Sequence, residues 1–359
     1  MQKATQDAWD INRKTSQKIT WVQFIASIFV VLDHSFNYIQ FVPSTQLEVF
    51  LCILLDKVRI GMTHIVMPSF FAISGFLLFK SAPKSEGVNC FGWYIDKLKS
   101  RALSLLLPFL LWNIIWSIFF MTLGALGMTS GNVDTTLTLP NVFAGIFKNK
   151  YNEVFWYMRV LIIYVLVSPV FYLLLKNKWC GYIWLIISVF LTLFIFPSTP
   201  VRAFSNFHNF FFYMVGCFIA LHHPNMINLS YRKKSIWVSL IVLLIASILL
   251  RLGQMQHPGL LFINRVIGFV AYWVCMDIFR SVNVKSFARY SFFIYATHKP
   301  IQQTFNKIFT KILQPNIAGH IINVYGGAAL TLLVIAFLAI VMKRVIPKCF
   351  ALLNGGRAK

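Results

Sequence analysis

Residues Ile19 to Phe41 form an apolar run of membrane length, with Asp33 and His34 in its outer half. A bilayer core of about 30 Å is crossed by about 20 apolar residues of helix, so the run predicts a spanning helix. Placing an ionisable side chain in such a helix costs roughly 2.5–3.5 kcal/mol, and these two residues therefore indicate a functional site. Gln23 precedes His34 by eleven residues. This spacing puts both side chains about 20° apart on one helix face, separated by about 16 Å of rise.

Further apolar runs follow along the 359 residues, of which 58% are hydrophobic and only 12% are charged. A water-soluble fold of this size carries about a quarter charged residues. The pattern predicts an all-α, polytopic integral membrane bundle of about ten transmembrane helices. We expect the spans near residues 20–42, 60–80, 102–124, 154–175, 181–197, 207–222, 235–251, 262–280, 288–309 and 321–342.

Most of the 33 Lys and Arg residues fall in alternate connections between these runs. Cytoplasmic loops carry the excess of positive charge, so the alternation predicts that both termini are cytoplasmic. The basic residues punctuate apolar helices instead of forming a patch, which argues against a nucleic-acid partner. We expect a polar cytoplasmic segment over 1–18, a transmembrane domain over 19–345 and a basic cytoplasmic tail over 346–359.

The six cysteines are scattered, with no Cys-x-x-Cys pair. Their spacing matches no metal site, and we expect them to be packing residues. The sequence predicts no bound metal and no permanently bound cofactor.

His34 is the leading candidate for chemistry. A neutral imidazole can accept a proton from a hydroxyl near neutral pH. The alternative is a structural histidine that bonds a neighbouring helix. Asp33 projects about 100° away on the helix, and it would either tune His34 or pair with a cation. One hypothesis pairs Arg159 with Asp33 or with Glu153.

Lys97, Lys99 and Arg101 crowd the cytoplasmic entry to the third predicted span. Such charge commonly anchors the topology of a membrane protein. The functional alternative is a cationic mouth for the phosphates of a cytosolic cofactor, since arginine binds phosphate with two parallel hydrogen bonds.

Several residues near the predicted outer surface could line an acceptor site: His64, Trp156, Arg159 and His298. Aromatic side chains there suit sugar stacking as well as lipid anchoring, which is the commoner reason for them. Within the second predicted span, Ser74 and Gly75 predict close packing against another helix.

Five segments, in order, resemble the acyltransferase-3 family of membrane O-acyltransferases along nearly the whole chain. They read WVQFIASIFVVLDHS, PSFFAISGFLLF, DKLKSRALSLLLPFLLW, FWYMRVLIIYVLVSPV and SFFIYATHKP. The first resembles the family's Arg-x10-His helix, and the third its Arg-x-x-Arg entry. By this resemblance His34 takes the place of the motif histidine and Arg101 that of the first basic residue. Gln23 stands where the family has arginine, and Ser104 stands at the second arginine of the pair.

The resemblance implies transfer of an acyl group, usually acetyl, from cytoplasmic acyl-CoA to a hydroxyl of a cell-surface carbohydrate or its precursor. His34 would be the general base, with Asp33 beside it, and Gln23, Lys97, Lys99 and Arg101 would bind the donor. The implied location is the bacterial inner membrane, with membrane lipids, acyl-CoA and a carbohydrate or glycolipid as partners.

A second class of function fits the same intramembrane charges. A proton-coupled transporter or flippase of a lipid or glycan would use Asp33, His34 and Arg159 as a proton relay. Transport would depend on the proton gradient and leave the substrate chemically unchanged, whereas acyl transfer would add mass to it.

Overall fold

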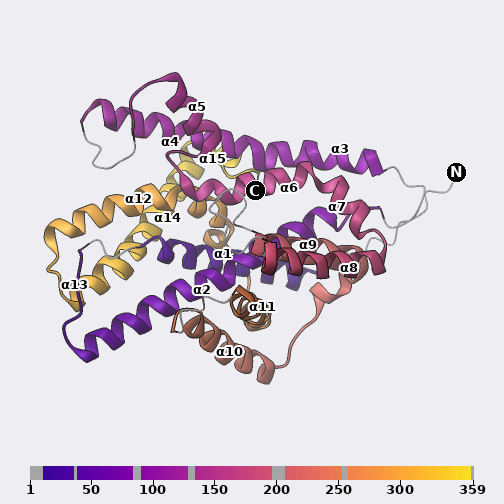
Figure 1. Ribbon diagram of the computed structural model, residues 1–359. Coiled ribbons are helices and arrows are strands. Elements are labelled where there is room, and N and C mark those ends of the chain that lie inside the picture. Colours follow the sequence, from indigo (N-terminus) through magenta and orange to yellow (C-terminus); the bar gives the residue numbers. More distant parts are fainter. Residues whose placement is uncertain are drawn as a thin grey trace. The chain divides into compact units, whose positions relative to one another are not determined.

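All regular structure in the part of the chain described here is helical. The computed structural model describes residues 11–35, 39–83, 90–127, 134–195, 207–252 and 258–356. Parts of the predicted terminal segments, 1–10 and 357–359, lie outside these residues. In chain order (Figure 1) the α-helices are α1 (Arg13–Asp33), α2 (Gln46–Phe79), α3 (Cys90–Arg101), α4 (Leu107–Ala125), α5 (Leu139–Lys148), α6 (Trp156–Leu166), α7 (Ser168–Leu175), α8 (Lys178–Phe190), α9 (Phe207–His222), α10 (Lys233–Leu252), α11 (Pro258–Cys275), α12 (Ser291–Ile312), α13 (Ile317–Ile321), α14 (Gly327–Val345) and α15 (Pro347–Leu353).

Several of these helices can cross a membrane by length and composition. Among the described residues there are five such stretches: Arg13–Asp33, Gln46–Phe79, Cys90–Ala125, Gly259–Phe279 and Ile317–Val345. The pair Glu153–Leu166 and Ser168–Leu175, bent by 62°, makes six if it counts as one span. A helix overlies at least part of each of the ten predicted segments, but some are short, such as α8 with 13 residues. The count of ten spans and the orientation of the termini therefore stay predictions.

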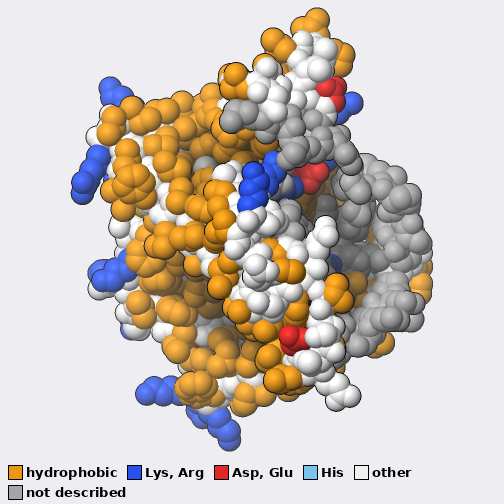
Figure 2. All heavy atoms as spheres, turned by 90° about the vertical axis from the view of Figure 1, so that its left-hand side faces the viewer, with side chains coloured by type: hydrophobic (Ala, Val, Ile, Leu, Met, Phe, Trp, Pro, Cys, Tyr) orange, Lys and Arg blue, Asp and Glu red, His pale blue; other side chains and the backbone are white. Residues whose placement is uncertain are grey.

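Large hydrophobic side chains lie exposed along many of the helices. They cover much of the described surface that faces the viewer in Figure 2. Examples are Trp237 and Ile241 on α10 and Leu333 and Phe337 on α14, each more than half exposed. A water-soluble monomer rarely exposes continuous apolar surface of this kind, so the helices are suited to contact with lipid.

The first helix ends earlier than the apolar run predicts. α1 stops at Asp33, so His34 follows the last helical residue instead of lying within a span that reaches residue 42. The end of the helix is held by Arg59 of α2, whose guanidinium Nη1 donates to the carbonyl oxygens of Leu32 at 2.7 Å and Asp33 at 3.1 Å. A cation at a helix C-terminus satisfies carbonyl groups that have no partner in the helix itself.

Helix α2 is the longest element and has a well-defined start. The Thr45 hydroxyl accepts from the Glu48 amide, and the Glu48 carboxylate accepts from the Thr45 amide. This reciprocal pair satisfies two amide groups at the helix start. Further along, a Cβ on Gly75 would lie 2.4 Å from the Tyr213 carbonyl oxygen of α9. Only glycine permits this approach, which agrees with the predicted close packing at Gly75.

The chain divides into two compact units, each with its own core. Unit 1 comprises Met1–Asp33, Val42–Lys97 and Val167–Ala288, and unit 2 comprises His34–Phe41, Leu98–Leu166 and Arg289–Lys359. In unit 1, α2 packs against α1, α9, α10 and α11. In unit 2, α12 packs against α14, and α4 packs against α5 and α15. The boundary between units falls between Asp33 and His34 at one point.

Candidate active site

Unit 2 brings together two of the histidines that the sequence singles out. The imidazole rings of His34 and His298 lie with centroids 5.1 Å apart and planes at 73°, an edge-to-face contact. His34 is half-buried, whereas His298 of α12 is fully buried. Residues separated by more than 260 positions in the sequence thus form one imidazole pair.

The hydrogen bonds of His298 fix the chemical character of its ring. Its Nδ1 lies 3.1 Å from the Ile294 carbonyl oxygen and 2.9 Å from that of Tyr295. A carbonyl oxygen only accepts, so Nδ1 carries the hydrogen and donates it. In the neutral ring Nε2 then carries a lone pair, and this atom is buried without a hydrogen-bonding partner among the described residues.

A proline in α12 explains how the helix is held beside this pair. Pro300 has no amide hydrogen, so the Ala296 carbonyl four residues earlier lacks its helical partner. The Trp116 indole of α4 donates to that oxygen at 3.0 Å, and the Asn152 side-chain amide donates at 3.4 Å. The proline therefore creates an acceptor through which other segments of unit 2 dock on α12.

The same face of α12 carries two further buried polar side chains that the sequence analysis did not single out. Gln302 and Asn306 are fully buried, and neither has a hydrogen-bonding partner for its amide nitrogen or oxygen in the described part of the chain. Leaving a buried polar group without a partner costs about 1–3 kcal/mol. The steps of four residues from His298 to Gln302 and from Gln302 to Asn306 were the signal available in the sequence, since they place all three on one helix face.

An aromatic row connects the expected residue Trp156 with His298 in unit 2. The rings of Trp156 and Tyr157 are 6.3 Å apart, those of Tyr157 and Tyr295 are 5.9 Å apart, and those of Tyr295 and His298 are 6.4 Å apart. Trp156 and Tyr157 open α6, after the short 3₁₀ helix Glu153–Phe155. Aromatic faces of this kind suit stacking as well as packing.

Arg159 lies on α6 and is partly exposed. Glu153, one of its two expected partners, forms an ion pair with Lys299 of α12, with 2.6 Å between the charged atoms. The pairing of Arg159 with Asp33 or Glu153 stays a hypothesis. This ion pair joins the start of α6 to α12 on the surface of unit 2.

Unit 1 contains the second expected acceptor histidine. His64 of α2 is half-buried, and its Nδ1 lies 2.8 Å from Nη2 of Arg265 on α11. Because a guanidinium only donates, this ring nitrogen accepts the hydrogen bond. His64 therefore supports Arg265 within unit 1.

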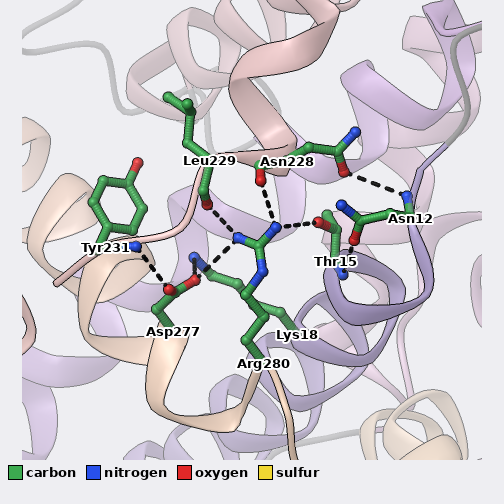
Figure 3. Close-up of polar contacts among 8 residues, drawn as sticks. All are labelled: Asn12, Thr15, Lys18, Asn228, Leu229, Tyr231, Asp277 and Arg280. Atoms are coloured by element: carbon green, nitrogen blue, oxygen red, sulfur yellow. Dashed lines mark hydrogen bonds and ion pairs between the residues drawn. The ribbon is translucent and has the colours of Figure 1, made fainter. Parts of the chain in front are cut away.

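Unit 1 also holds a buried ionic cluster near the start of α1 (Figure 3). Lys18 is fully buried, and its ammonium lies 3.0 Å from the Asp277 carboxylate and 4.2 Å from the centre of the Trp273 ring. Arg280 pairs with the same carboxylate at 3.4 Å and donates to Thr15 and to the carbonyl oxygens of Asn228 and Leu229. Lys18 is thus engaged in fixing α1.

The residues expected at the donor side occupy two helices. Lys97, Lys99 and Arg101 lie in the last two turns of α3, which continues through a π-helical turn over Ala102–Leu106 into α4. Gln23 lies on α1 and is half-buried. Their role towards a donor stays a prediction.

The comparisons with known proteins assign the chain to a family. A family model described as an acyltransferase domain matches residues 16–342, nearly the whole chain. The chain therefore belongs to this acyltransferase family, the one that its five motif segments resemble, and it is a multi-pass membrane protein of that family. No curated protein and no solved structure matched the chain.

Proposed function

We propose that this protein is a membrane O-acyltransferase that moves an acyl group, most simply acetyl, from cytoplasmic acyl-CoA to a hydroxyl of a cell-surface carbohydrate or its precursor. The family supports acyl transfer in general. The observation that carries the proposal for this chain is the His34–His298 pair. The half-buried imidazole of His34 lies beside the buried ring of His298, whose Nε2 has no hydrogen-bonding partner among the described residues.

In the proposed reaction, His34 is the general base. Its imidazole takes the proton of the acceptor hydroxyl as that oxygen attacks the thioester carbonyl. The new C–O bond forms, the C–S bond breaks, and the leaving thiolate recovers a proton from the imidazolium. General-base catalysis contributes about 10²–10⁴ to such rates. Asp33, the preceding residue, is proposed to stabilise the imidazolium.

The donor and acceptor are proposed to use different residues. Lys97, Lys99 and Arg101 supply cations for the phosphates of coenzyme A, and Gln23 supplies an uncharged hydrogen-bonding group. The acceptor is proposed to contact Trp156 and His298, with Arg159 and His64 as further candidates. The location that fits these substrates is the bacterial inner membrane.

Mass spectrometry of surface glycans tests this proposal. Cells that make the protein should show glycans heavier by one acetyl group than cells that lack it, and expression of the wild-type chain should restore the mass. His34→Ala should insert in the membrane and fail to restore the mass, while His223→Ala, directly after α9, should restore it fully. An unchanged glycan mass combined with transport driven by a proton gradient would instead support the transporter alternative.

A further inference from the structure

Unit 1 contains an arginine inside a candidate membrane span. Arg265 lies on α11, within the apolar stretch Gly259–Phe279 that is long enough to cross a bilayer. Its guanidinium Nη2 donates to Nδ1 of His64 on α2 at 2.8 Å. An arginine in such a stretch is costly to insert, and it usually pairs with an acidic group or belongs to a functional site.

Arg265 differs in its partners from the other buried cations of unit 1. Arg265 pairs with no carboxylate in the described part of the chain, and its Nε is buried without a hydrogen-bonding partner there. Three other buried cations each face a carboxylate, in the pairs Lys18–Asp277, Arg280–Asp277 and Arg59–Asp56. The described residues therefore leave the positive charge of Arg265 without a counter-charge.

The hydrogen bond between Arg265 and His64 limits what the two side chains can bind. A guanidinium has only donors, so His64 Nδ1 accepts, and in the neutral ring the hydrogen then lies on Nε2. Beyond their mutual hydrogen bond, the two side chains thus offer donors and one positive charge. A negatively charged acceptor complements this set, and phosphate binds a guanidinium through two parallel hydrogen bonds.

Apolar side chains flank the pair along both helices. His64 and Arg265 are partly exposed, so a ligand can reach them from the surface. The residues one turn before and after them are also partly exposed, and all are apolar: Ile60 and Met67 on α2, and Leu261 and Phe269 on α11. These four residues form the apolar strip. A ligand that matches the strip and the pair has apolar chains joined to an anionic group, as a lipid phosphate does.

Close packing holds α11 against α2 beside the pair. A Cβ on Gly268, one turn after Arg265, would lie 2.8 Å from side-chain atoms of Ile65 on α2. Arg265 lies six residues from Gly259, the nearer end of the apolar stretch, which is about 9 Å along the helix. Arginine side chains near the end of a span extend toward the lipid headgroups. The pair is therefore suited to meet lipid phosphates at that end.

We propose that Arg265 and His64 bind the phosphate group of an anionic membrane lipid, whose acyl chains lie along the apolar strip. The phosphate supplies the negative charge that the described residues do not provide for Arg265. Neither the acyl donor nor the acceptor takes part in this binding, which is therefore independent of the proposed function.

Native mass spectrometry of the full chain in a neutral detergent measures the number and affinity of bound lipids. Dioleoyl phosphatidic acid is the probe, and dioleoylglycerol, with the same chains and no phosphate, is its control. The wild type should bind the first molecule of phosphatidic acid at least about tenfold more tightly than dioleoylglycerol. Inorganic phosphate at the same concentration should not displace it, because the free ion has no acyl chains. Equal binding of the two lipids, or displacement by inorganic phosphate, would overturn the proposal.

Arg265→Gln distinguishes this site from the other basic groups of the protein. Glutamine keeps a donor for His64 and removes the charge, so the first phosphatidic acid should bind at least about tenfold more weakly. Arg232→Gln, an exposed position directly before α10, is the matched control and should bind the lipid as the wild type does. Unchanged affinity in Arg265→Gln, or an equal loss in Arg232→Gln, would contradict the site.

Thermal unfolding separates a lipid site from a purely structural link between α2 and α11. Without phospholipid, Arg265→Gln should unfold at a temperature no lower than the wild type, because it removes a charge that lacks a carboxylate partner. Added phosphatidic acid should stabilise the wild type more than the variant, since a ligand that binds only the folded state stabilises it. A variant that is less stable by the same amount with and without lipid would overturn the proposal.

Arg265→Lys is a second variant that keeps the positive charge within the span. An ammonium cannot form the two parallel hydrogen bonds of a guanidinium, so the first phosphatidic acid should bind at least about threefold more weakly than to the wild type. Wild-type affinity in Arg265→Lys would contradict the proposed contact with phosphate.

Discussion

The imidazole of His34 contacts the imidazole of His298 edge to face, with 5.1 Å between ring centroids. The two rings are held differently. His298 is fixed by its own helix through two carbonyl oxygens, whereas His34 directly follows the end of α1. The rigid His298 ring gives His34, the proposed base, a fixed neighbour. The backbone of His34, in contrast, depends on how the end of α1 is capped.

Arg59 is expected to control the position of the segment that leads to His34. Arg59→Met removes the cap from the Leu32 and Asp33 carbonyl groups and should lower the free energy of unfolding by about 1.5–3 kcal/mol, the range for hydrogen bonds to charged groups. The rate of acyl transfer should fall by more than the loss of folded protein accounts for. Asp56→Asn is the control, because it removes the Arg59 ion pair and leaves the carbonyl contacts. Equal effects of both substitutions in thermal unfolding would contradict the capping role.

Trp116 is expected to matter because of Pro300. Trp116→Phe removes the donor to the Ala296 carbonyl and should destabilise the protein by about 1–2 kcal/mol. In a Pro300→Ala background the restored amide hydrogen can satisfy that carbonyl, so the same substitution should cost less. Trp112→Phe, which loses a bond to the Leu353 carbonyl, should cost the same in both backgrounds. Chemical unfolding of all the variants measures this, and an unchanged cost of Trp116→Phe would refute the explanation.

Lys18 is expected to stabilise the fold and not to bind the donor. Lys18→Met removes one of the cations that balance the negative charge of the buried Asp277 carboxylate. This substitution should lower the free energy of unfolding by about 3–5 kcal/mol. Adding Asp277→Asn should recover part of this loss, and the exposed neighbour Lys14→Met should have little effect. Thermal unfolding provides the measurement. A Lys18→Met protein of wild-type stability with weakened donor affinity would reverse the assignment.

The loop before α5 should lose stability only in acid. Hydrogen bonds from the Thr136 hydroxyl, the Asn141 amide and the Thr136 backbone hold the pKa of Asp134 well below its ordinary value. A lowered pKa in the folded state means that the ionised carboxylate contributes stability above about pH 4 and loses this contribution as the pH falls from there. Asp134→Asn should lower the free energy of unfolding by a constant amount over about pH 5–8, where its slope against pH stays unchanged, and should flatten its pH dependence below about pH 4. A changed slope near neutral pH in this variant would disagree with the contacts.

The family, the helical class and the positions of most helices could be predicted from the sequence, because apolar runs of membrane length directly indicate helices. The end of α1 could not, since it depends on Arg59, a side chain from another helix. The contact between His34 and His298 likewise depends on packing between segments far apart in the chain. The four-residue spacing of Gln302 and Asn306 on one helix face can be read from the sequence. Only the packing of the structure shows that both amides are buried without hydrogen-bonding partners among the described residues.

The most direct test of the central claim is acetyl transfer from radiolabelled acetyl-CoA in membrane vesicles that contain either the wild-type protein or His34→Ala at equal abundance. The wild type should place label in the glycan fraction, and His34→Ala should do so at least about 100-fold more slowly, as expected for loss of a general base. Label transferred by His34→Ala at the wild-type rate would contradict the account.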